Sequence, residues 1–167
     1  TEISEDLKRF IEAQISVFLA TANSEGQPYI QHRGGPPGFL RVLDEKTIAF
    51  VDYNGNRQFI SSGNLHDNPK FHLFLIDYAN RRRVKIWGEA QVVEGDQAFI
   101  TELMPAGYKA RPEQVILLKI SAWDANCPQH IPQRFEADDV VKMQNEYVQK
   151  IEALETEIRN LRITFKE

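Results

Sequence analysis

The close spacing of short strand-like segments is the feature that most constrains what this chain can fold into. Apolar runs recur along most of the sequence, at residues 17–22, 28–33, 39–43, 47–53, 71–78, 83–93 and 115–123. Turn signals separate several of them, as at Asn23–Gly26 and Ala79–Asn80. This many strands at such short intervals, with small helices between them, favour an antiparallel barrel over a parallel sheet.

Three short helices are expected among these strands. Ser4 can cap the first, and the acidic residues Glu5 and Asp6 suit its first turn because that end of a helix carries partial positive charge. The second extends from about residue 57 to 65 after a turn at 54–56. It ends at Asn68–Pro69, because the residue before a proline is pushed out of the helical region. The third occupies residues 96–104.

The sequence changes character at about Glu136. From there an apolar stripe continues on a charged background, with members mostly four and three residues apart: Val140, Tyr147, Ile151, Leu154, Ile158 and Leu161. This heptad-like pattern predicts an amphipathic helix of roughly 25 residues. The helix can lie on its own barrel or pack against its symmetry mate in a dimer, and both interpretations remain open. We therefore expect a barrel domain at 1–135 and a helix at 136–167.

Composition excludes several classes of site. The chain has 167 residues, which suits one domain with an appendage, and its net charge of −4 argues against a broad nucleic-acid-binding face. Cys127 is the only cysteine, so an intrachain disulfide and a cysteine-based zinc site are excluded. No His, Asp or Glu cluster has metal-ligand spacing, and no apolar run reaches the ~18 residues of a membrane span. With no export signal visible, we expect a cytoplasmic protein.

A first candidate for binding chemistry is Asn54-Gly55-Asn56-Arg57-Gln58, at a strand end and a predicted helix start. A helix N-terminus exposes unpaired N–H groups and partial positive charge, which suit a phosphate. The guanidinium of Arg57 can add two parallel hydrogen bonds to phosphate oxygens. A capped turn with a surface arginine is the alternative.

A second candidate is the segment Pro28–Gly35. Polar and apolar side chains alternate in it, and Gly34 and Gly35 allow another group to approach the backbone closely. A flat ring system could lie along such a strand edge. An amphipathic strand that ends in a turn explains the same residues.

A third candidate is Arg81-Arg82-Arg83, which opens a predicted strand. Because successive side chains of a strand alternate, the three cannot all face one way. One or two of them are expected in solvent, and one can point into a site for an anionic cofactor.

A fourth candidate is the segment 123–131, which is expected to form a loop after the last strand and contains Cys127, Gln129 and His130. A Cys/His nucleophile pair would need a third orienting group, and the spacing shows none. We expect these residues to pack against whatever fills the nearest pocket. His66 and His72 are interpreted as structural.

The order of several motifs resembles the pyridoxamine 5′-phosphate oxidase-like family of FMN-binding split barrels. The resemblance covers roughly residues 5 to 131 and rests on four motifs in this order: Gly26-Gln27-Pro28-Tyr29, Ile48-Ala49-Phe50 leading to Gly55-Asn56-Arg57-Gln58, Asn68-Pro69 before a hydrophobic strand, and residues 82–90. The segment 126–131 is similar to a marker of a flavin-nucleotide-binding branch of that family.

The resemblance implies an FMN cofactor and a homodimer with two sites at its interface, each drawing on both chains. It places the flavin along Gln31, His32, Arg33, Gly34 and Gly35, and against Val51 and Asp52. It places the FMN phosphate on Asn56, Arg57 and Gln58, with Arg83 contributing from a later strand. We add Gln129 and His130 to these cofactor-binding candidates.

Departures from the family pattern narrow the expected activity. Pro36 stands where the oxidase has a lysine, Gln58 replaces the phosphate-binding lysine, and the C-terminal arginine and histidine motif is missing. A role in vitamin B6 salvage is therefore not expected. We expect an FMN-dependent oxidoreductase, with a small-molecule electron donor or substrate. The alternatives are a non-catalytic flavin carrier or redox sensor, or a haem-binding split barrel with His130 or His32 as axial ligand.

Overall fold

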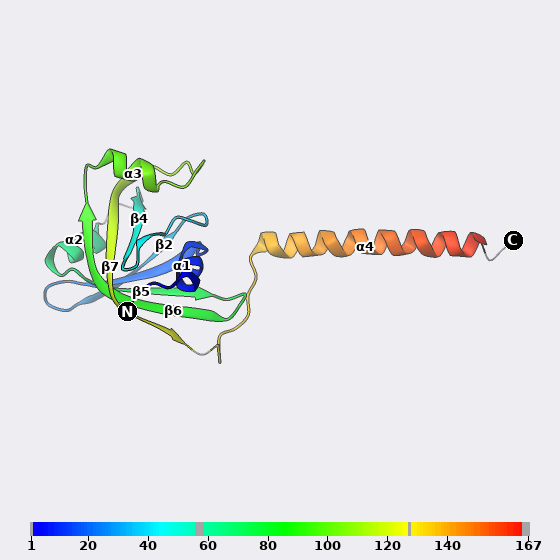
Figure 1. Ribbon diagram of the computed structural model, residues 1–167, viewed down its shortest axis with the longest axis horizontal. Helices are drawn as coiled ribbons and strands as arrows, with labels where there is room; N and C mark the ends of the chain where they lie inside the picture. Colours follow the sequence, from blue (N-terminus) through cyan, green and yellow to red (C-terminus); the bar gives the residue numbers. More distant parts are fainter. Residues whose placement is uncertain (1, 56–58, 127, 165–167) are drawn as a thin grey trace. The chain divides into compact units, whose positions relative to one another are not determined.

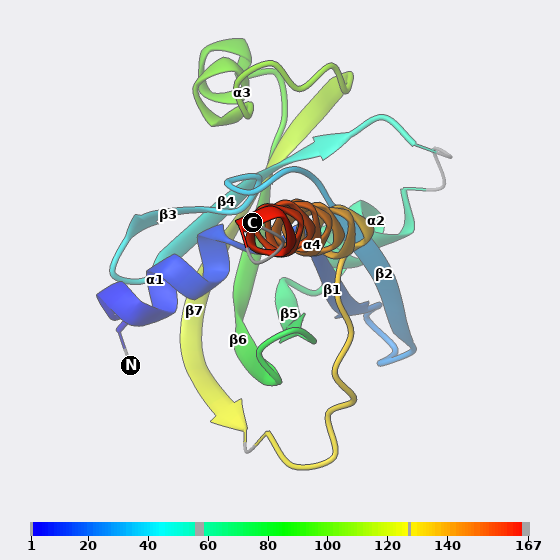
Figure 2. The ribbon, with the colours of Figure 1, turned by 90° about the vertical axis from the view of Figure 1, so that its right-hand side faces the viewer.

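The structure is a computed structural model that describes residues 2–55, 59–126 and 128–164. Within these ranges seven strands form one antiparallel sheet, in the order β2-β1-β5-β6-β7-β4-β3. The strands are β1 (Ser16–Ala22), β2 (Pro28–Gly34), β3 (Arg41–Asp44), β4 (Thr47–Tyr53), β5 (Lys70–Asp77), β6 (Arg82–Val93) and β7 (Pro112–Asn126). The sheet curls without closing (Figures 1 and 2), which is the predicted split antiparallel barrel.

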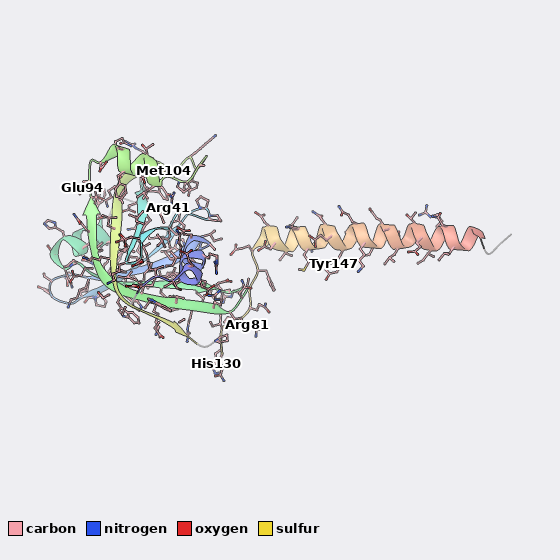
Figure 3. All side chains as sticks on the ribbon, viewed as in Figure 1. Arg41, Arg81, Glu94, Met104, His130 and Tyr147 are labelled. Carbon is pink, nitrogen blue, oxygen red and sulfur yellow. The ribbon has the colours of Figure 1, made fainter. Side chains whose placement is uncertain are left out.

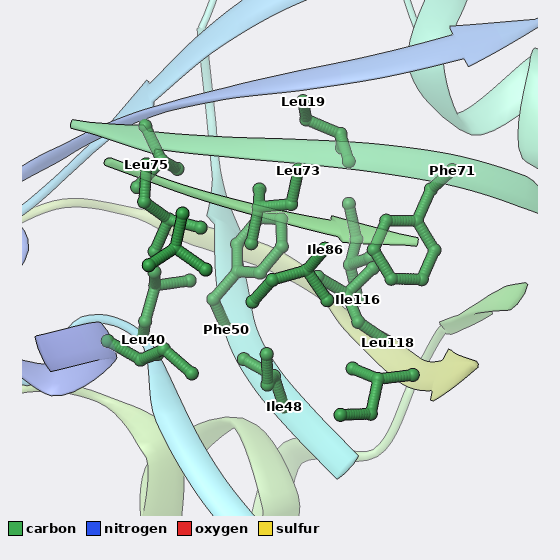
Figure 4. Close-up of a cluster of buried hydrophobic side chains, with 14 of the residues drawn as sticks. Leu19, Leu40, Ile48, Phe50, Phe71, Leu73, Leu75, Ile86, Ile116 and Leu118 are labelled. Carbon is green, nitrogen blue, oxygen red and sulfur yellow. The ribbon is translucent and has the colours of Figure 1, made fainter. Parts of the chain in front are cut away.

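The core lies on the inner, concave face of this sheet. Alternate residues of β1, β5 and β6 are buried, as the period of two predicts: Val17, Leu19, Phe71, Leu73, Leu75, Val84 and Ile86. Phe50 of β4 and Leu118 of β7, the next two strands of the sheet, belong to the same core cluster (Figure 4). Full burial of each such side chain contributes about 1.5–3 kcal/mol of transfer free energy, which makes this face the main source of stability.

β6 and β7 form the longest pairing, and it contains a register shift between Trp87 and Gly88. At Gly88 the backbone of β7 approaches so closely that a Cβ atom would lie 2.9 Å from the Cα of Ile120. Only glycine leaves room for that approach, which explains its place in the motif at 82–90.

The helices are α1 (Glu5–Glu12), α2 (Ile60–Asp67), α3 (Gln97–Leu103) and α4 (Ala137–Thr164). The predicted cap of α1 is confirmed, since the side chain of Ser4 accepts a hydrogen bond from the backbone N–H of Leu7. Asp96 caps α3 in the same way.

Three predicted boundaries were wrong. α2 begins at Ile60, after Phe59 in a left-handed conformation, and not at about residue 57. Residues 39 and 40, expected in a strand, precede β3, and both side chains are buried in the core. Residues 123–126 belong to β7 and not to a loop, because they pair with residues 83–86 of β6. In the second and third cases a tertiary contact overrides the local pattern.

The chain divides into two compact units, Thr1–Ile131 and Pro132–Glu167. The second unit contains α4, a continuous helix of 28 residues, which confirms the predicted C-terminal helix. The large apolar side chains of its stripe are exposed, Tyr147, Ile151, Leu154, Ile158 and Leu161 among them.

Candidate functional site

A buried ion pair connects the two ends of the open sheet. Arg33 lies on β2 at one end of the strand order, and Asp52 lies on β4 near the other. Nη1 of Arg33 donates a hydrogen bond to Oδ1 of Asp52 at 2.6 Å, and the side chains are only 14% and 8% exposed. The pair therefore joins strands that share no backbone ladder.

Side chains from β7 and α2 extend this pair into a network. Nε2 of Gln114 donates to Oδ2 of Asp52 at 3.1 Å and to Oγ of Ser62 at 2.7 Å. Ser61, the neighbour of Ser62 on α2, donates through Oγ to Oε1 of Gln31 at 2.8 Å. Two candidates from the sequence, Gln31 and Arg33, are thus tied to α2 and β4 on the inner side of the sheet.

The electrostatics of the network centre on Asp52. Burial raises the pKa of this carboxyl above its ordinary value, while Arg33 and the hydrogen bond from Gln114 oppose that rise. The short ion pair argues that the carboxylate form is retained at neutral pH. Nε of Arg33 is buried and has no hydrogen-bond partner among the described residues, so one strong donor of the network is left over.

Sequence reasoning missed Gln114, Ser61 and Ser62. Gln114 is 6% exposed and Ser61 is 1% exposed, which is unusual for polar side chains. Nothing in their local sequence marks them, because their role follows from β7 lying beside β4 and from Ser62 of α2 lying within hydrogen-bond distance of Gln114.

Gly34 at the end of β2 and Gly35 directly after it are closely packed. A Cβ atom on Gly35 would lie 2.6 Å from Cβ of Phe39, and one on Gly34 would lie 3.1 Å from the carbonyl oxygen of Ile15. The group that approaches the backbone closely at Gly35 is therefore a core side chain. Val51 is likewise a core residue, with a side chain 1% exposed.

His32 and Arg83 lie on the opposite face of the sheet from Arg33. His32 alternates with Arg33 along β2, and its Nε2 lies 2.9 Å from Oγ of Ser16. Arg83 alternates with the buried Val84 along β6 and so points outward, and its buried Nε has no partner among the described residues. One chain therefore does not bring Arg33 and Arg83 together.

The outer face also carries a stacked pair of rings. His72 of β5 and Trp87 of β6 stack with centroids 5.2 Å apart and an interplanar angle of 6°. Burial first and the charge of Lys85 second lower the pKa of His72, so its neutral form is favoured. His72 is thus a residue of the sheet, as the sequence predicts.

A cavity of about 670 Å³ lies beside the network, between α2, the C-terminal end of β6 and the N-terminal end of β7. It lies within the ~300–1,000 Å³ range of small-molecule sites. Its lining includes both Ser62 and Gln114, together with Phe59, Gly63, Leu65, His66, Ala90, Gln91, Val92 and Glu94.

The turn after β7 does not join this region. Gln129 and His130 are exposed and follow the C-terminal end of β7. Gln114 lies near the opposite end of that strand, which is 15 residues long. Figure 3 shows His130 far from Glu94, which marks the cavity. Asn56, Arg57, Gln58 and Cys127 lie outside the described residues, so the predicted phosphate site stays a prediction.

In the part of the chain that the structure describes, no group of three or more His, Cys, Asp or Glu side chains is placed to hold a metal ion. Over the same residues, none of the helices combines the length and the apolar character needed to cross a membrane.

Comparison with known proteins agrees with this architecture. The sequence profile of the pyridoxamine 5′-phosphate oxidase family matches residues 3–127. No protein with a curated description matches the chain.

Three solved structures share the fold. HupZ of Group A Streptococcus is 20% identical, with a TM-score of 0.55 over 80% of this chain and 99% of its own. A proposed pyridoxamine 5′-phosphate oxidase from Lactobacillus delbrueckii is 20% identical, with a TM-score of 0.56 over 74% of this chain and 93% of its own. An FMN-binding protein from Syntrophomonas wolfei is 12% identical, with a TM-score of 0.57 over 72% of this chain and 84% of its own.

Proposed function

This chain belongs to the pyridoxamine 5′-phosphate oxidase family, and on that premise we propose that it is an FMN-binding flavoprotein acting as an oxidoreductase. The family and the FMN-binding protein of similar fold support the flavin. The observation that carries the proposal for this chain is the buried Arg33–Asp52–Gln114 network, in which Nε of Arg33 has no hydrogen-bond partner among the described residues.

The residues present fit an FMN molecule. Nε of Arg33 is a charged donor without a partner among the described residues, and carbonyl oxygens of a flavin ring are suitable acceptors. Arg33 and Gln31 would hold the ring side of the cofactor, and Arg57 with Asn56 would hold its phosphate. The adjacent cavity of about 670 Å³ adds room for a small substrate.

The proposal includes a homodimer. Arg33 and Arg83 point to opposite faces of the sheet in one chain, and each has a buried Nε without a partner among the described residues. A flavin that contacts both must therefore lie between two chains, with Arg83 contributed by the second. This arrangement satisfies both donors with one ligand.

When bound, FMN would supply two-electron chemistry by hydride transfer. The chain supplies position and charge. The guanidinium of Arg33 is fixed by its 2.6 Å contact with Asp52, and it would stabilise negative charge on a bound flavin ring. Asp52 is engaged by Arg33 and Gln114, so its role is to orient Arg33 rather than to move a proton.

A carrier or sensor function would use the same residues, and turnover separates it from an enzyme. An oxidoreductase must be reduced by a donor and reoxidised by an acceptor repeatedly. A haem site would require an available axial histidine. His32 is hydrogen-bonded to Ser16, which leaves the exposed His130 as the candidate for that role.

The test is an absorbance titration of the purified protein with FMN, with riboflavin as the ligand lacking the phosphate. We expect FMN to bind far more tightly than riboflavin. Arg57→Ala should weaken FMN binding by ~1.5–3 kcal/mol, which is roughly 10- to 150-fold, and should leave riboflavin binding unchanged.

Arg41→Ala is the matched control, because Arg41 is exposed on the edge strand β3. Equal losses in both variants would show that the phosphate site is misplaced. Failure of the unchanged protein to bind either flavin, or a Soret band on addition of haem, would overturn the proposal.

A further inference from the structure

We propose that α4 forms a parallel, in-register two-stranded coiled coil with α4 of a second copy of this chain. α4 lies in the second unit, and its pairing with a second copy does not depend on the flavin. Over the described residues this unit contains a single helix, which cannot bury its own apolar stripe.

The stripe follows the heptad repeat, and it does so most strictly in the second half of the helix. Val140, Tyr147, Leu154 and Leu161 occupy d positions, while Ile151 and Ile158 occupy a positions. In the second half of the helix the seam is narrow, because Lys150 and Glu157 at g and Glu155 at e flank it with charge. A helix that docks on a barrel needs a wider apolar face, whereas a seam of a and d residues matches another helix.

The residue types at the seam select two parallel strands. β-branched isoleucine at a, as at Ile151 and Ile158, combined with leucine at d, as at Leu154 and Leu161, favours parallel dimers over larger bundles. The exposed fraction of these four side chains is 49–54%, so none of them is buried within the second unit itself.

Charge complementarity sets the direction and the register. In a parallel pair without offset, a g residue meets the e residue five positions later in the partner, which places Lys150 beside Glu155 of the second copy. The two-fold symmetry makes this contact twice. An antiparallel pair that overlaps the same a and d layers would instead place Lys150 beside Lys150 of the second copy, and two like charges repel each other.

Gln144, the polar residue at an a position, leads to the same conclusion. In the parallel register the two Gln144 amides face each other, and each can donate to the carbonyl oxygen of the other. In the antiparallel overlap Gln144 would face Leu154, which would bury an amide without a partner. A single polar a residue is a known means of fixing register in coiled coils.

The experiment is disulfide cross-linking of the full chain in a Cys127→Ser background, with each new cysteine placed at a known heptad position. Leu154→Cys and Gln144→Cys should each cross-link to themselves under mild oxidation. Gln149→Cys, at the outward f position, is the matched control and should not.

Each outcome decides the matter. If the two single variants fail alone but cross-link when mixed, the helices are antiparallel and the proposal is overturned. If no combination cross-links, the stripe does not face a second copy, and packing on its own barrel replaces the proposal. Flavin binding is not part of this readout, so the failure of one proposal does not entail the failure of the other.

Exchanging the charges at positions 150 and 155 tests the register in a way that does not depend on how the introduced cysteines affect packing. In the Leu154→Cys background, Lys150→Glu should slow cross-linking roughly 10-fold, because two attractive pairs become repulsive. Adding Glu155→Lys should restore the rate. Residues 150 and 155 are five apart and are not neighbours on one helix, so restoration must come from contact between two helices.

Discussion

Replacing Arg33 with methionine tests the central ion pair most directly. The methionine keeps most of the aliphatic stem of the side chain, so the change removes the charge and its hydrogen bond with little loss of packing. Asp52 then remains as a carboxylate that is 8% exposed, with Gln114 as its remaining hydrogen-bond partner.

The expected loss follows from this burial. Removing one member of a buried pair typically costs about 3–5 kcal/mol, because the other charge is left without compensation. Arg9→Met is the matched control, since it removes an exposed pair with Asp6 whose side chains are 72% and 70% exposed. Exposed pairs of this kind contribute about 0.2–1 kcal/mol.

The pH dependence provides a second criterion. Burial already raises the pKa of Asp52, and without Arg33 the pKa should rise further. A group with a raised pKa in the folded state binds protons more tightly there than when unfolded, so its contribution to stability falls as the pH rises. The deficit of Arg33→Met should therefore be largest at neutral pH and should shrink in acid, where Asp52 is protonated and needs no cation.

The measurement is urea denaturation of both variants and the unchanged protein at pH 4.5 and pH 7.5. A deficit at neutral pH no larger than that of Arg9→Met would refute the reasoning. So would a deficit that does not change with pH, because it would then arise from packing and not from charge.

Two further predictions concern the sheet and α2. Gly88→Ala should lower the free energy of unfolding by about 3 kcal/mol, because the new Cβ would meet the backbone of β7 at Ile120. Gly63→Ala has open space at its Cβ and should raise the free energy of unfolding by about 0.5–1 kcal/mol. Thermal unfolding measures both variants, and equal effects would contradict the close approach at Gly88. Burial and the charge of Lys85 lower the pKa of His72, so its protonation favours the unfolded state and stability should rise with pH just below 6.5. His72→Phe should abolish this rise. Denaturation at pH 5 and pH 7.5 measures it, and the same change in stability between the two pH values in both proteins would contradict the prediction.

The sequence by itself determined most of the secondary structure. Seven segments with strand-like patterns correspond to the seven described strands, and Ser4 and Asn68–Pro69 marked the start of α1 and the end of α2. Alternation along a strand, capping and the effect of proline act over a few residues, so they are visible without knowledge of the fold. The heptad stripe of α4 is local in the same sense.

Only the tertiary structure decided which polar residues meet. Arg33 and Asp52 come together because β2 and β4 lie near opposite ends of one curled sheet, and Gln114 joins them because β7 pairs with β4. The separation of Arg33 from Arg83 depends on register across several strands, where a shift of one residue would reverse the face. Strand order and register are set by contacts between residues far apart in the chain, and a local pattern carries no record of them.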